Sequence, residues 1–455
     1  MILSGPSQIL RSEDQASFPG LAGLPISKIN IHTRRVDEGY VRKIIRLKEG
    51  DVFRSEDIEK VRENLYALKF FKKVEIAASK DASSNGVILN LELEDGWYLL
   101  PLPLIIGGGG GINASLLLTE RNVFKRAESA FLFGGGNRDG GFGSAGYQFD
   151  RFAISGGYAK RSFTEWAYAD GAFNAAGRLR ASGSQSSAEK LGPIQNQYDK
   201  TVEEENFQFR YPVSRRLGGS LGFSSQNIGY GGLAAGVLPF DGGIVNSVSA
   251  GLSLWLSRQS VHRSMEASHD LGAIFGFGMA DLTERIQPLS RIQTQTSADL
   301  SFSESARAIG SDFDFTKLSF GVQPSVTFKD HERLSLRIKA TSGLQENLPL
   351  SQKVATGRDL GMRGHYAREF RGDRGAGAAL DFSYPFRRTH RGVWTGELFA
   401  DAATLWDSGR SFDKQGVGFS LSYQFWRFPI PLGLTYTYSA DDKDAQVNFA
   451  FGGRF

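Results

Sequence analysis

The chain has 455 residues, enough for one small domain followed by a large one. A net charge of only +4 does not indicate a nucleic-acid-binding surface, and the absence of cysteine excludes disulfides and thiolate metal sites. The chain contains 55 glycines and 34 phenylalanines. Such abundant glycine and aromatic residues favour an all-β protein with many turns and aromatic rims.

Residues 1–24 contain Ser, Gly and Pro without a regular apolar pattern, and we expect an irregular tail there. The first twenty residues include Arg11, Glu13 and Asp14 and lack the apolar stretch of a signal peptide. If the protein is exported, this sequence would therefore represent a mature or engineered form.

Residues 25–96 have the pattern of a compact αβ domain. Ile29 and Ile31 alternate with polar neighbours, which predicts a half-buried strand. Asp37 and Ser55 are suitable N-caps for two helices whose apolar residues recur at helical spacing. Two further strands are predicted over residues 71–77 and 87–94. The predicted order is therefore strand, helix, helix, strand, strand.

Residues 97–119 carry no charge and are long enough to cross a membrane as a helix. Pro101, Pro103 and the five glycines at 107–111 interrupt this stretch, so a membrane helix is not expected. We predict a Gly/Pro-rich junction over residues 97–111. The glycines are not followed by Gly-Lys-Ser/Thr, which excludes a phosphate-binding loop of the Walker type.

Residues 112–455 repeatedly alternate apolar and polar positions. The clearest segments are residues 246–256, 334–341, 380–386, 417–425 and 446–455. Alternation with period two occurs both in soluble sandwiches and in membrane barrels. A polar face rich in Ser, Thr, Gln, Arg and Lys, and aromatic residues near the C-terminal end, favour a membrane barrel with a watery interior.

The strand count in this region can be estimated from the same alternation. Sixteen strand starts fit between Ile112 and Gln446, including one near Ser264. Residues 164–200 fit either strand extensions or a long loop. Because open strand edges in lipid would leave backbone groups unpaired, we expect residues 112–455 to close into a barrel.

Two motifs in this region resemble those of the BamA, TamA and FhaC superfamily of outer-membrane assembly and secretion barrels, the bacterial surface antigen type. Met362-Arg363-Gly364-His365 resembles its [VIM]-R-G-[FY] turn, with His365 in place of the usual aromatic residue. Leu398-Phe399-Ala400-Asp401-Ala402-Ala403 resembles its F-x-D-x-G strand motif, with Ala403 in place of glycine. Residues 25–96 resemble the POTRA module of the same superfamily through the segments 48–51, 65–68 and 71–76.

The resemblance implies a mainly β fold, a 16-stranded transmembrane antiparallel β-barrel preceded by one small αβ POTRA domain. Residues 343–377 would form a loop folded into the barrel with an Arg-Gly turn at its tip. Strand alternation places Asp401 on the inward face, where a bidentate pair with Arg363 would hold the loop. The expected loop lock comprises Arg363, Gly364, Asp381, Glu397, Phe399 and Asp401.

Members of this superfamily are thought to open or strain the seam between the first and last strands. On that basis we expect a lateral seam formed by Ile112, Leu116, Val447, Phe449, Phe451 and Phe455. The glycines at 107–111 would loosen one side of that seam, because glycine weakens strand pairing.

The function implied by the resemblance is non-enzymatic assembly in the bacterial outer membrane, with the POTRA domain in the periplasm. The barrel would assist insertion or translocation of client proteins through its seam. Its partners would be outer-membrane lipid, unfolded client or passenger polypeptides, and accessory periplasmic or lipoprotein partners. The alternatives are a two-partner-type secretion pore that exports one passenger through the lumen, and a lipid-trafficking barrel.

An enzymatic role finds no support in the sequence. Gly218-Gly219-Ser220-Leu221-Gly222 matches the G-x-S-x-G pattern of hydrolases but lies in a strand pattern of small residues, without the strand, turn and helix of a nucleophile elbow. The six histidines have no spacing typical of metal ligands. We therefore expect no catalytic residue, metal or cofactor.

Overall fold

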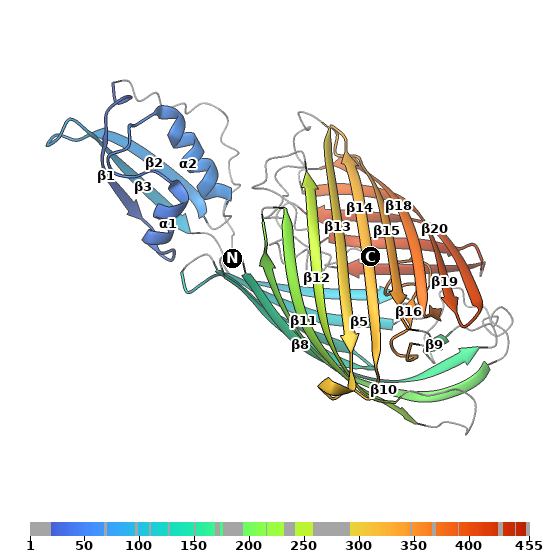
Figure 1. The fold of residues 1–455 in the computed structure, drawn as a ribbon. Helices are drawn as coiled ribbons and strands as arrows, with labels where there is room; N and C mark the ends of the chain where they lie inside the picture. The colour runs from blue at the N-terminus through green and yellow to red at the C-terminus, as the bar shows by residue number, and fades with distance from the viewer. Residues whose placement is uncertain are drawn as a thin grey trace. The chain divides into compact units, whose positions relative to one another are not determined.

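The fold was analysed in a computed structural model. The structure describes residues 20–67, 71–95, 99–108, 111–125, 128–149, 152–168, 173–175, 194–214, 216–231, 242–257, 292–345, 348–365, 370–389, 391–425, 431–441 and 443–451. The chain divides into an N-terminal αβ unit and a β-barrel unit (Figure 1). No described helix is both long enough and apolar enough to cross a bilayer.

The N-terminal unit packs two helices against a three-stranded sheet. Its elements are β1 (Ile26–His32), α1 (Glu38–Ile45), α2 (Ser55–Ala67), β2 (Phe71–Lys80) and β3 (Val87–Asp95). The sheet order is β1-β3-β2, with β1 parallel and β2 antiparallel to β3. The order of these elements along the chain confirms the prediction of strand, helix, helix, strand, strand.

Local sequence explains why α1 begins where it does. The Asp37 carboxylate accepts a hydrogen bond from the backbone N–H of Tyr40 at 2.9 Å, which satisfies one of the free donors of the first helical turn. Val41 and Ile45, four residues apart, are buried on one face of the helix. They join one hydrophobic core with residues of α2 and all three strands.

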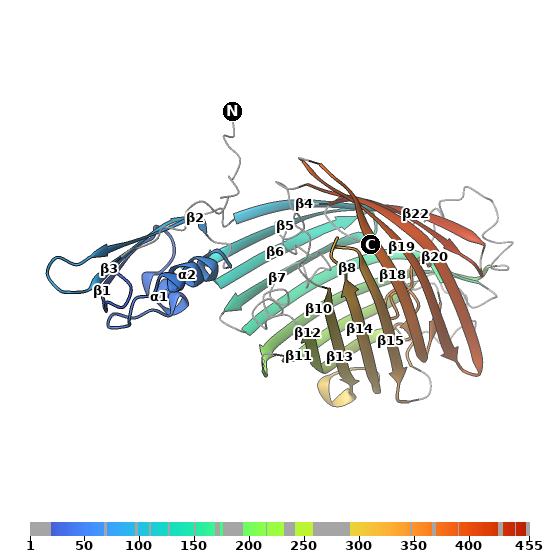
Figure 2. The same cartoon turned by 90° about the horizontal axis from the view of Figure 1, so that it is seen from above.

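The barrel consists of long antiparallel strands that follow one another around the wall (Figure 2). Their bounds are β4 (Leu99–Gly108), β5 (Gly111–Val123), β6 (Glu128–Asn137), β7 (Gly140–Phe149), β8 (Phe152–Tyr168), β10 (Ile194–Pro212), β11 (Leu217–Gly231), β12 (Gly243–Ser257), β13 (Gln293–Ser305), β14 (Phe315–Thr327), β15 (Arg333–Gly343), β18 (Arg374–Arg388), β19 (Gly392–Asp407), β20 (Arg410–Phe425), β21 (Pro431–Ser439) and β22 (Asp444–Phe451). The short strand β9 (Phe173–Ala175) extends the pairing of β8.

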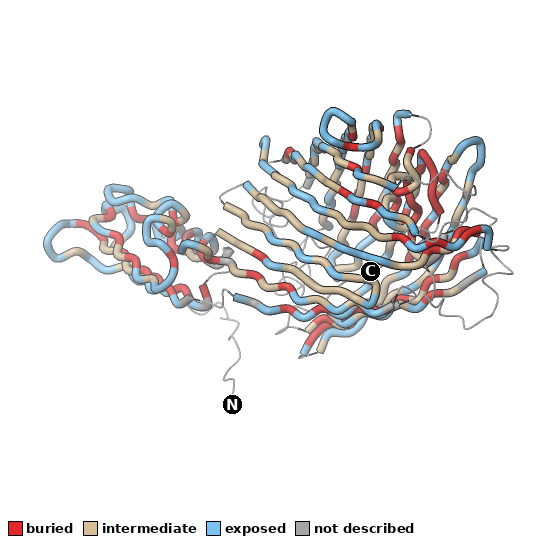
Figure 3. The backbone as a smooth tube through the Cα atoms, turned by 90° about the horizontal axis from the view of Figure 1, so that it is seen from below, coloured by how far each residue is buried: buried red, intermediate tan, exposed pale blue. Residues whose placement is uncertain are grey.

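The barrel closes because β22 pairs with β4. The described strands thus form a closed 16-stranded antiparallel barrel, as the fold class predicts. Large apolar side chains on alternating positions of the strands are exposed, for example Leu398 at 64% and Phe419 at 48%. Figure 3 shows the alternation of burial along the strands. Such a surface is stable in contact with lipid and would be unfavourable in water.

The first strand of the barrel corrects our domain boundary. We expected residues 97–111 to be a junction and the barrel to begin at Ile112, but β4 begins at Leu99 and includes Pro101 and Pro103. Both prolines are exposed, and the intervening Leu102 is buried, so β4 keeps the alternation of a barrel strand. Proline offers no N–H to the ladder, and both prolines lie in the first half of β4, where the barrel wall begins.

A second difference concerns the expected strand near Ser264. That residue lies outside the described residues, and β12 pairs directly with β13 across this part of the sequence. The predicted count of sixteen strands is nevertheless correct. The prediction missed β4 and placed a strand near Ser264, between β12 and β13, which pair with each other. The ambiguous segment 164–200 includes the end of β8 and the start of β10, which pair with each other.

The connection between β15 and β18 lies inside the barrel. It contains the paired two-residue strands β16 (Val354–Ala355) and β17 (Arg371–Gly372). Val354 and Phe370 are no more than 1% exposed. They form a hydrophobic cluster with Tyr168 of β8 and Leu405 of β19. We call residues 344–373 the lumen loop.

Candidate functional site

The tip of the lumen loop is a tight turn around Arg363. Gly361 and Gly364 have φ angles of +72° and +86°, a conformation that glycine adopts without steric cost. The backbone N–H of Met362 donates to the carbonyl of Thr356 at 3.1 Å, and the Met362 side chain is buried. A Cβ on Gly364 would lie 2.6 Å from Cγ2 of Thr437. The turn therefore fits against the wall only with glycine at this position.

The Arg363 guanidinium binds three carboxylates of the wall. Its Nε and Nη2 donate to the two oxygens of Asp401 at 2.9 and 2.7 Å, which is a bidentate pair. Nη2 also donates to Asp381 at 2.5 Å, and Nη1 donates to Glu397 at 3.1 Å. The backbone N–H of Arg363 adds a bond to Asp401 at 2.9 Å. The structure thus brings together all the charged residues of the expected loop lock.

The strands explain how these groups converge. Glu397, Phe399 and Asp401 occupy alternate positions of β19 and so share one face of the strand. Asp381 of β18 is paired in register with Phe399, which places it beside the same face. The Phe399 ring lies 3.6 Å from Cζ of Arg363, in a cation–π contact. The side chain of Asp401 is only 1% exposed, so its charge depends on Arg363 for neutralisation.

The two residues that depart from the motifs also pack at this site. His365 Nε2 lies 3.2 Å from Oγ of Ser439, and its ring meets the Phe370 ring edge-on at 5.8 Å between centroids. Histidine therefore occupies the place of an aromatic residue in the packing. Ala403 is buried in the cluster that surrounds the lumen loop.

The seam of the barrel joins β22 to β4. Among the described residues, these strands pair at Phe449–Gly107, Ala450–Ile106 and Phe451–Ile105, three positions in all. On its other side, β22 pairs with β21 at eight positions. The Phe449 ring lies over Gly107, where an added Cβ would be 2.1 Å from the ring. The seam therefore joins the first and last strands of the barrel, with the Phe449 ring seated on Gly107.

The composition of the seam differs from our expectation. Phe449 and Phe451 lie on it, and Val447 lies on β22 before the paired positions. Ile112 and Leu116 lie on β5, one strand away, because the unexpected strand β4 occupies the seam. Phe455 lies outside the described residues.

The comparisons with known proteins address the N-terminal unit first. Residues 24–96 match the family model POTRA, described as "Surface antigen variable number repeat". These residues form a POTRA domain. Among the curated proteins, no sequence matches this chain.

Solved structures match both the POTRA domain and the barrel. BamA from Haemophilus ducreyi lacking POTRA domains 1–3 has a TM-score of 0.58 and 14% identity, over 94% of this chain and 84% of that chain. CdiB from Escherichia coli has a TM-score of 0.57 and 13% identity, over 94% and 76%. CdiB from Acinetobacter baumannii has a TM-score of 0.55 and 12% identity, over 94% and 73%. The chain therefore has the fold shared by BamA and CdiB.

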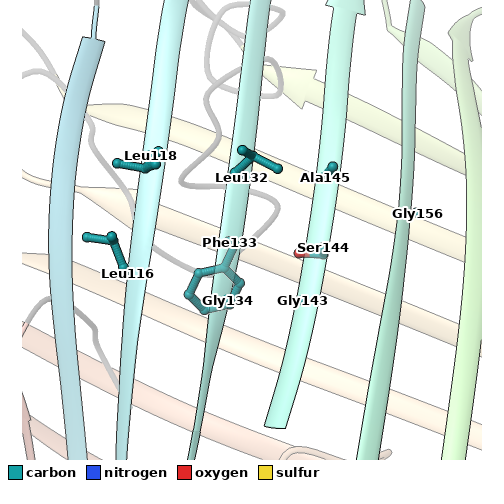
Figure 4. Close-up of a pocket in the computed structure, with 9 residues that line it drawn as sticks. All are labelled: Leu116, Leu118, Leu132, Phe133, Gly134, Gly143, Ser144, Ala145 and Gly156. Atoms are coloured by element: carbon teal, nitrogen blue, oxygen red, sulfur yellow. The ribbon is translucent and has the colours of Figure 1, made fainter.

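A shallow hollow lies over β5 to β8. Small residues such as Gly134, Ala145 and Gly156 leave a depression of about 600 Å³ beside Leu116 and Leu132 (Figure 4). Leu116, which we assigned to the seam, therefore lines this hollow instead.

Sequence analysis missed several charged contacts of the lumen loop. Lys353 pairs with Asp407 of β19 and lies 3.6 Å from Asp373. Arg371 pairs with Glu165 of β8, which is 206 residues earlier in the chain. The sequence signals for these contacts were weak. A lysine or arginine in a loop is usually exposed to solvent, and an acid in a strand, such as Glu165, is not by itself evidence of an ion pair.

Proposed function

We propose that this chain is an outer-membrane barrel that assists the insertion of client β-strands through the seam between β4 and β22, with its POTRA domain in the periplasm. The observation that carries the proposal is the closure of the barrel at this seam, where its first and last strands pair. The fold shared with BamA and CdiB supports a role in protein assembly or secretion.

Energetic comparison favours the seam over the lumen as the route for a client. A backbone hydrogen bond contributes roughly 0.5–1.5 kcal/mol net, so the bonds of the seam can be exchanged one at a time at small cost. Leaving the edge open in lipid would be unfavourable, but an incoming strand would supply the same hydrogen bonds. Displacing the lumen loop would instead break the buried ion pairs of Arg363, and breaking one such pair costs roughly 3–5 kcal/mol.

The chemistry needed for this function is binding and folding, without catalysis. A client strand that pairs with β4 or β22 gains backbone hydrogen bonds with little demand on its sequence. Burial of its apolar side chains in lipid then provides the free energy for insertion. The POTRA domain offers the edge of its sheet, at β1 or β2, as an earlier place for strand pairing.

A disulfide across the seam tests the proposal. Because the chain lacks cysteine, the pair Ile105→Cys and Phe451→Cys can be introduced without background thiols. In liposomes, the oxidised variant should lose acceleration of the folding of unrelated barrel clients, and reduction should restore it. The matched control is Ser420→Cys with Thr435→Cys, a facing pair between β20 and β21, which should leave activity unchanged. Full activity of the oxidised seam variant would overturn the proposal.

The secretion-pore alternative predicts a different result in the same preparations. A passenger exported through the lumen would still pass when the seam is cross-linked, and it would block single-channel conductance. A lipid-trafficking barrel would instead move lipid between vesicles without accelerating client folding. Each outcome separates one alternative from the proposed insertion through the seam.

A further inference from the structure

We propose that the outer face of the barrel binds a phospholipid with a phosphoethanolamine headgroup, in a groove at the rim where β13 begins. The apolar floor of the groove holds part of an acyl chain, and the charged lip of the groove holds the headgroup. Such a site requires only that the barrel lies in a bilayer. It is therefore independent of client insertion through the seam.

The floor of the groove consists of apolar side chains on the outer face of the wall. The strands β13, β14, β15 and β18 are neighbours in the sheet (Figure 1). Leu334 of β15 pairs with Val326 of β14 and with Phe382 of β18, and directly paired residues share one face of a sheet. A hollow of about 450 Å³ lies among Ile292, Phe328 and Phe382, which are 53%, 37% and 40% exposed.

The lip of the groove carries charges of both signs. Lys329, Asp330 and Glu332, all from the turn between β14 and β15, line it. The backbone N–H of Phe328 donates to the carbonyl of Glu332 at 2.8 Å and closes this turn. Nη2 of Arg388 in β18 donates to the carbonyl of Asp330 at 3.3 Å, which brings a second cation to the turn. These residues place two carboxylates and two cations beside the apolar floor.

Aromatic rings on the neighbouring strands indicate the depth of the lip in a bilayer. The ring centroids of Trp394 in β19 and Tyr423 in β20 lie 4.7 Å apart. Trp394 is paired in register with Arg387, the neighbour of Arg388. Tryptophan and tyrosine are enriched where the hydrocarbon core of a bilayer meets water. A groove beside these rings therefore extends from the depth of the acyl chains to the depth of the headgroups.

The strand order indicates which leaflet the groove faces. β4 is the first strand of the barrel and β13 is the ninth, so both begin at the same rim of this antiparallel wall. The POTRA domain precedes β4 in the chain. With that domain in the periplasm, this rim lies in the periplasmic leaflet, and we expect the ligand to be a phospholipid of that leaflet.

The mixed charges of the lip favour a zwitterionic headgroup with N–H donors. Lys329 and Arg388 suit the phosphate of phosphoethanolamine, and Asp330 and Glu332 can accept hydrogen bonds from its primary ammonium. A phosphoglycerol headgroup is anionic and brings no cation to the two carboxylates. A phosphocholine headgroup has no N–H to donate to them. Phosphoethanolamine is therefore the headgroup that satisfies both the cations and the acids.

Photo-crosslinking in vesicles tests both the headgroup and the position of the site. The full chain is reconstituted into phosphatidylcholine vesicles that contain a small fraction of a phospholipid with a diazirine in its acyl chain. Three such probes with identical chains carry phosphoethanolamine, phosphoglycerol or phosphocholine. Mass spectrometry should find the phosphoethanolamine probe on peptides containing Phe328 or Phe382 about threefold more often than the other two, the preference expected from one or two exposed ion pairs.

Variants of the lip separate specific binding from general contact with lipid. Asp330→Asn with Glu332→Gln should lower labelling by the phosphoethanolamine probe to the level of the phosphocholine probe, with the barrel still shifting on gels after heating. The matched control is Glu304→Gln, at an exposed acid near the other end of β13, which should leave labelling unchanged. Equal labelling by the three probes, stronger labelling by the phosphoglycerol probe, or full labelling of the double variant would overturn the proposal.

Discussion

At the scale of single residues, Arg363 acts as the counter-charge for a group of wall carboxylates. Its planar guanidinium binds Asp401 with two nitrogens and still reaches Asp381 and Glu397. A lysine at this position would carry the same charge but would lack the fork that matches a carboxylate. Three wall acids among the described residues share this arginine, so the structure depends strongly on it.

We predict that Arg363→Ala destabilises the barrel by about 3–5 kcal/mol, because it leaves Asp401 buried without its counter-charge. Client insertion should fall sharply, while the barrel remains folded at low temperature. The double variant Arg363→Ala with Asp401→Ala should lose less stability than the sum of the single variants. Denaturant unfolding of the three variants measures the difference, and additive losses would show that the pair does not interact.

A second residue-scale prediction concerns Gly364. Gly364→Ala should destabilise the barrel more than Gly409→Ala, although the two glycines have similar φ angles of +86° and +84°. The difference arises because nothing lies within 4 Å of a Cβ at Gly409, whereas one at Gly364 would meet Thr437. Gly409→Ala alone should cost about 1–2 kcal/mol through backbone strain. Adding Thr437→Ser should recover part of the extra loss, and equal losses in the two alanine variants would contradict the contact.

At the scale of elements, local capping and long-range pairing contribute separately to the fold. The POTRA helix α1 begins at a side-chain cap and ends at Arg46 in the left-handed conformation, both decided within a few residues. Strand β4, in contrast, belongs to the barrel through its pairing with β22, more than 300 residues later in the chain. Closing the seam therefore requires pairing between opposite ends of the barrel sequence.

The cap of α1 can be tested by Asp37→Ala, which should cost about 1 kcal/mol of stability in the POTRA domain. Hydrogen exchange of the full chain should show faster exchange at the first turn of α1, with β-barrel amides unaffected. Lys43→Ala, at an exposed position of the same helix, should leave this exchange unchanged. Similar acceleration in both variants would contradict a capping role.

At the scale of the whole molecule, the described part of the lumen loop packs against the barrel wall and pairs with its acids through Arg363. Residues 344–373 can be replaced by a short turn, because Ser342 of β15 and Arg374 of β18 are already paired and such a turn can connect the two strands. The lock carboxylates Asp381, Glu397 and Asp401 would then face an open lumen without Arg363.

We predict that this deletion produces a large, cation-selective conductance, since a ring of carboxylates favours cations in a pore. The reversal potential in a salt gradient across a planar bilayer measures the selectivity. Adding Asp381→Asn and Asp401→Asn to the deletion should reduce the selectivity and retain the conductance. An anion-selective or non-selective pore in the deletion variant would show that these acids do not face the lumen.

Local patterns in the sequence were sufficient for much of this protein. Helical spacing and N-caps predicted the POTRA element order, and period-two alternation predicted which residues of β19 share a face. Because alternation and caps depend on near neighbours, they can be read without knowing the fold. The motif around Arg363 and the acid Asp401 were found through family resemblance, and the structure places them in contact.

Only the tertiary structure decided which strands meet and which charges pair across the lumen. Pro101 and Pro103 argued locally against a membrane helix and for a junction, yet closure of the sheet makes β4 the partner of β22 and moves Ile112 and Leu116 away from the seam. Arg371 and Glu165 are separated by 206 residues, and no local pattern links them. Periodicity reports the face on which a side chain lies, whereas its partner depends on how the whole barrel closes.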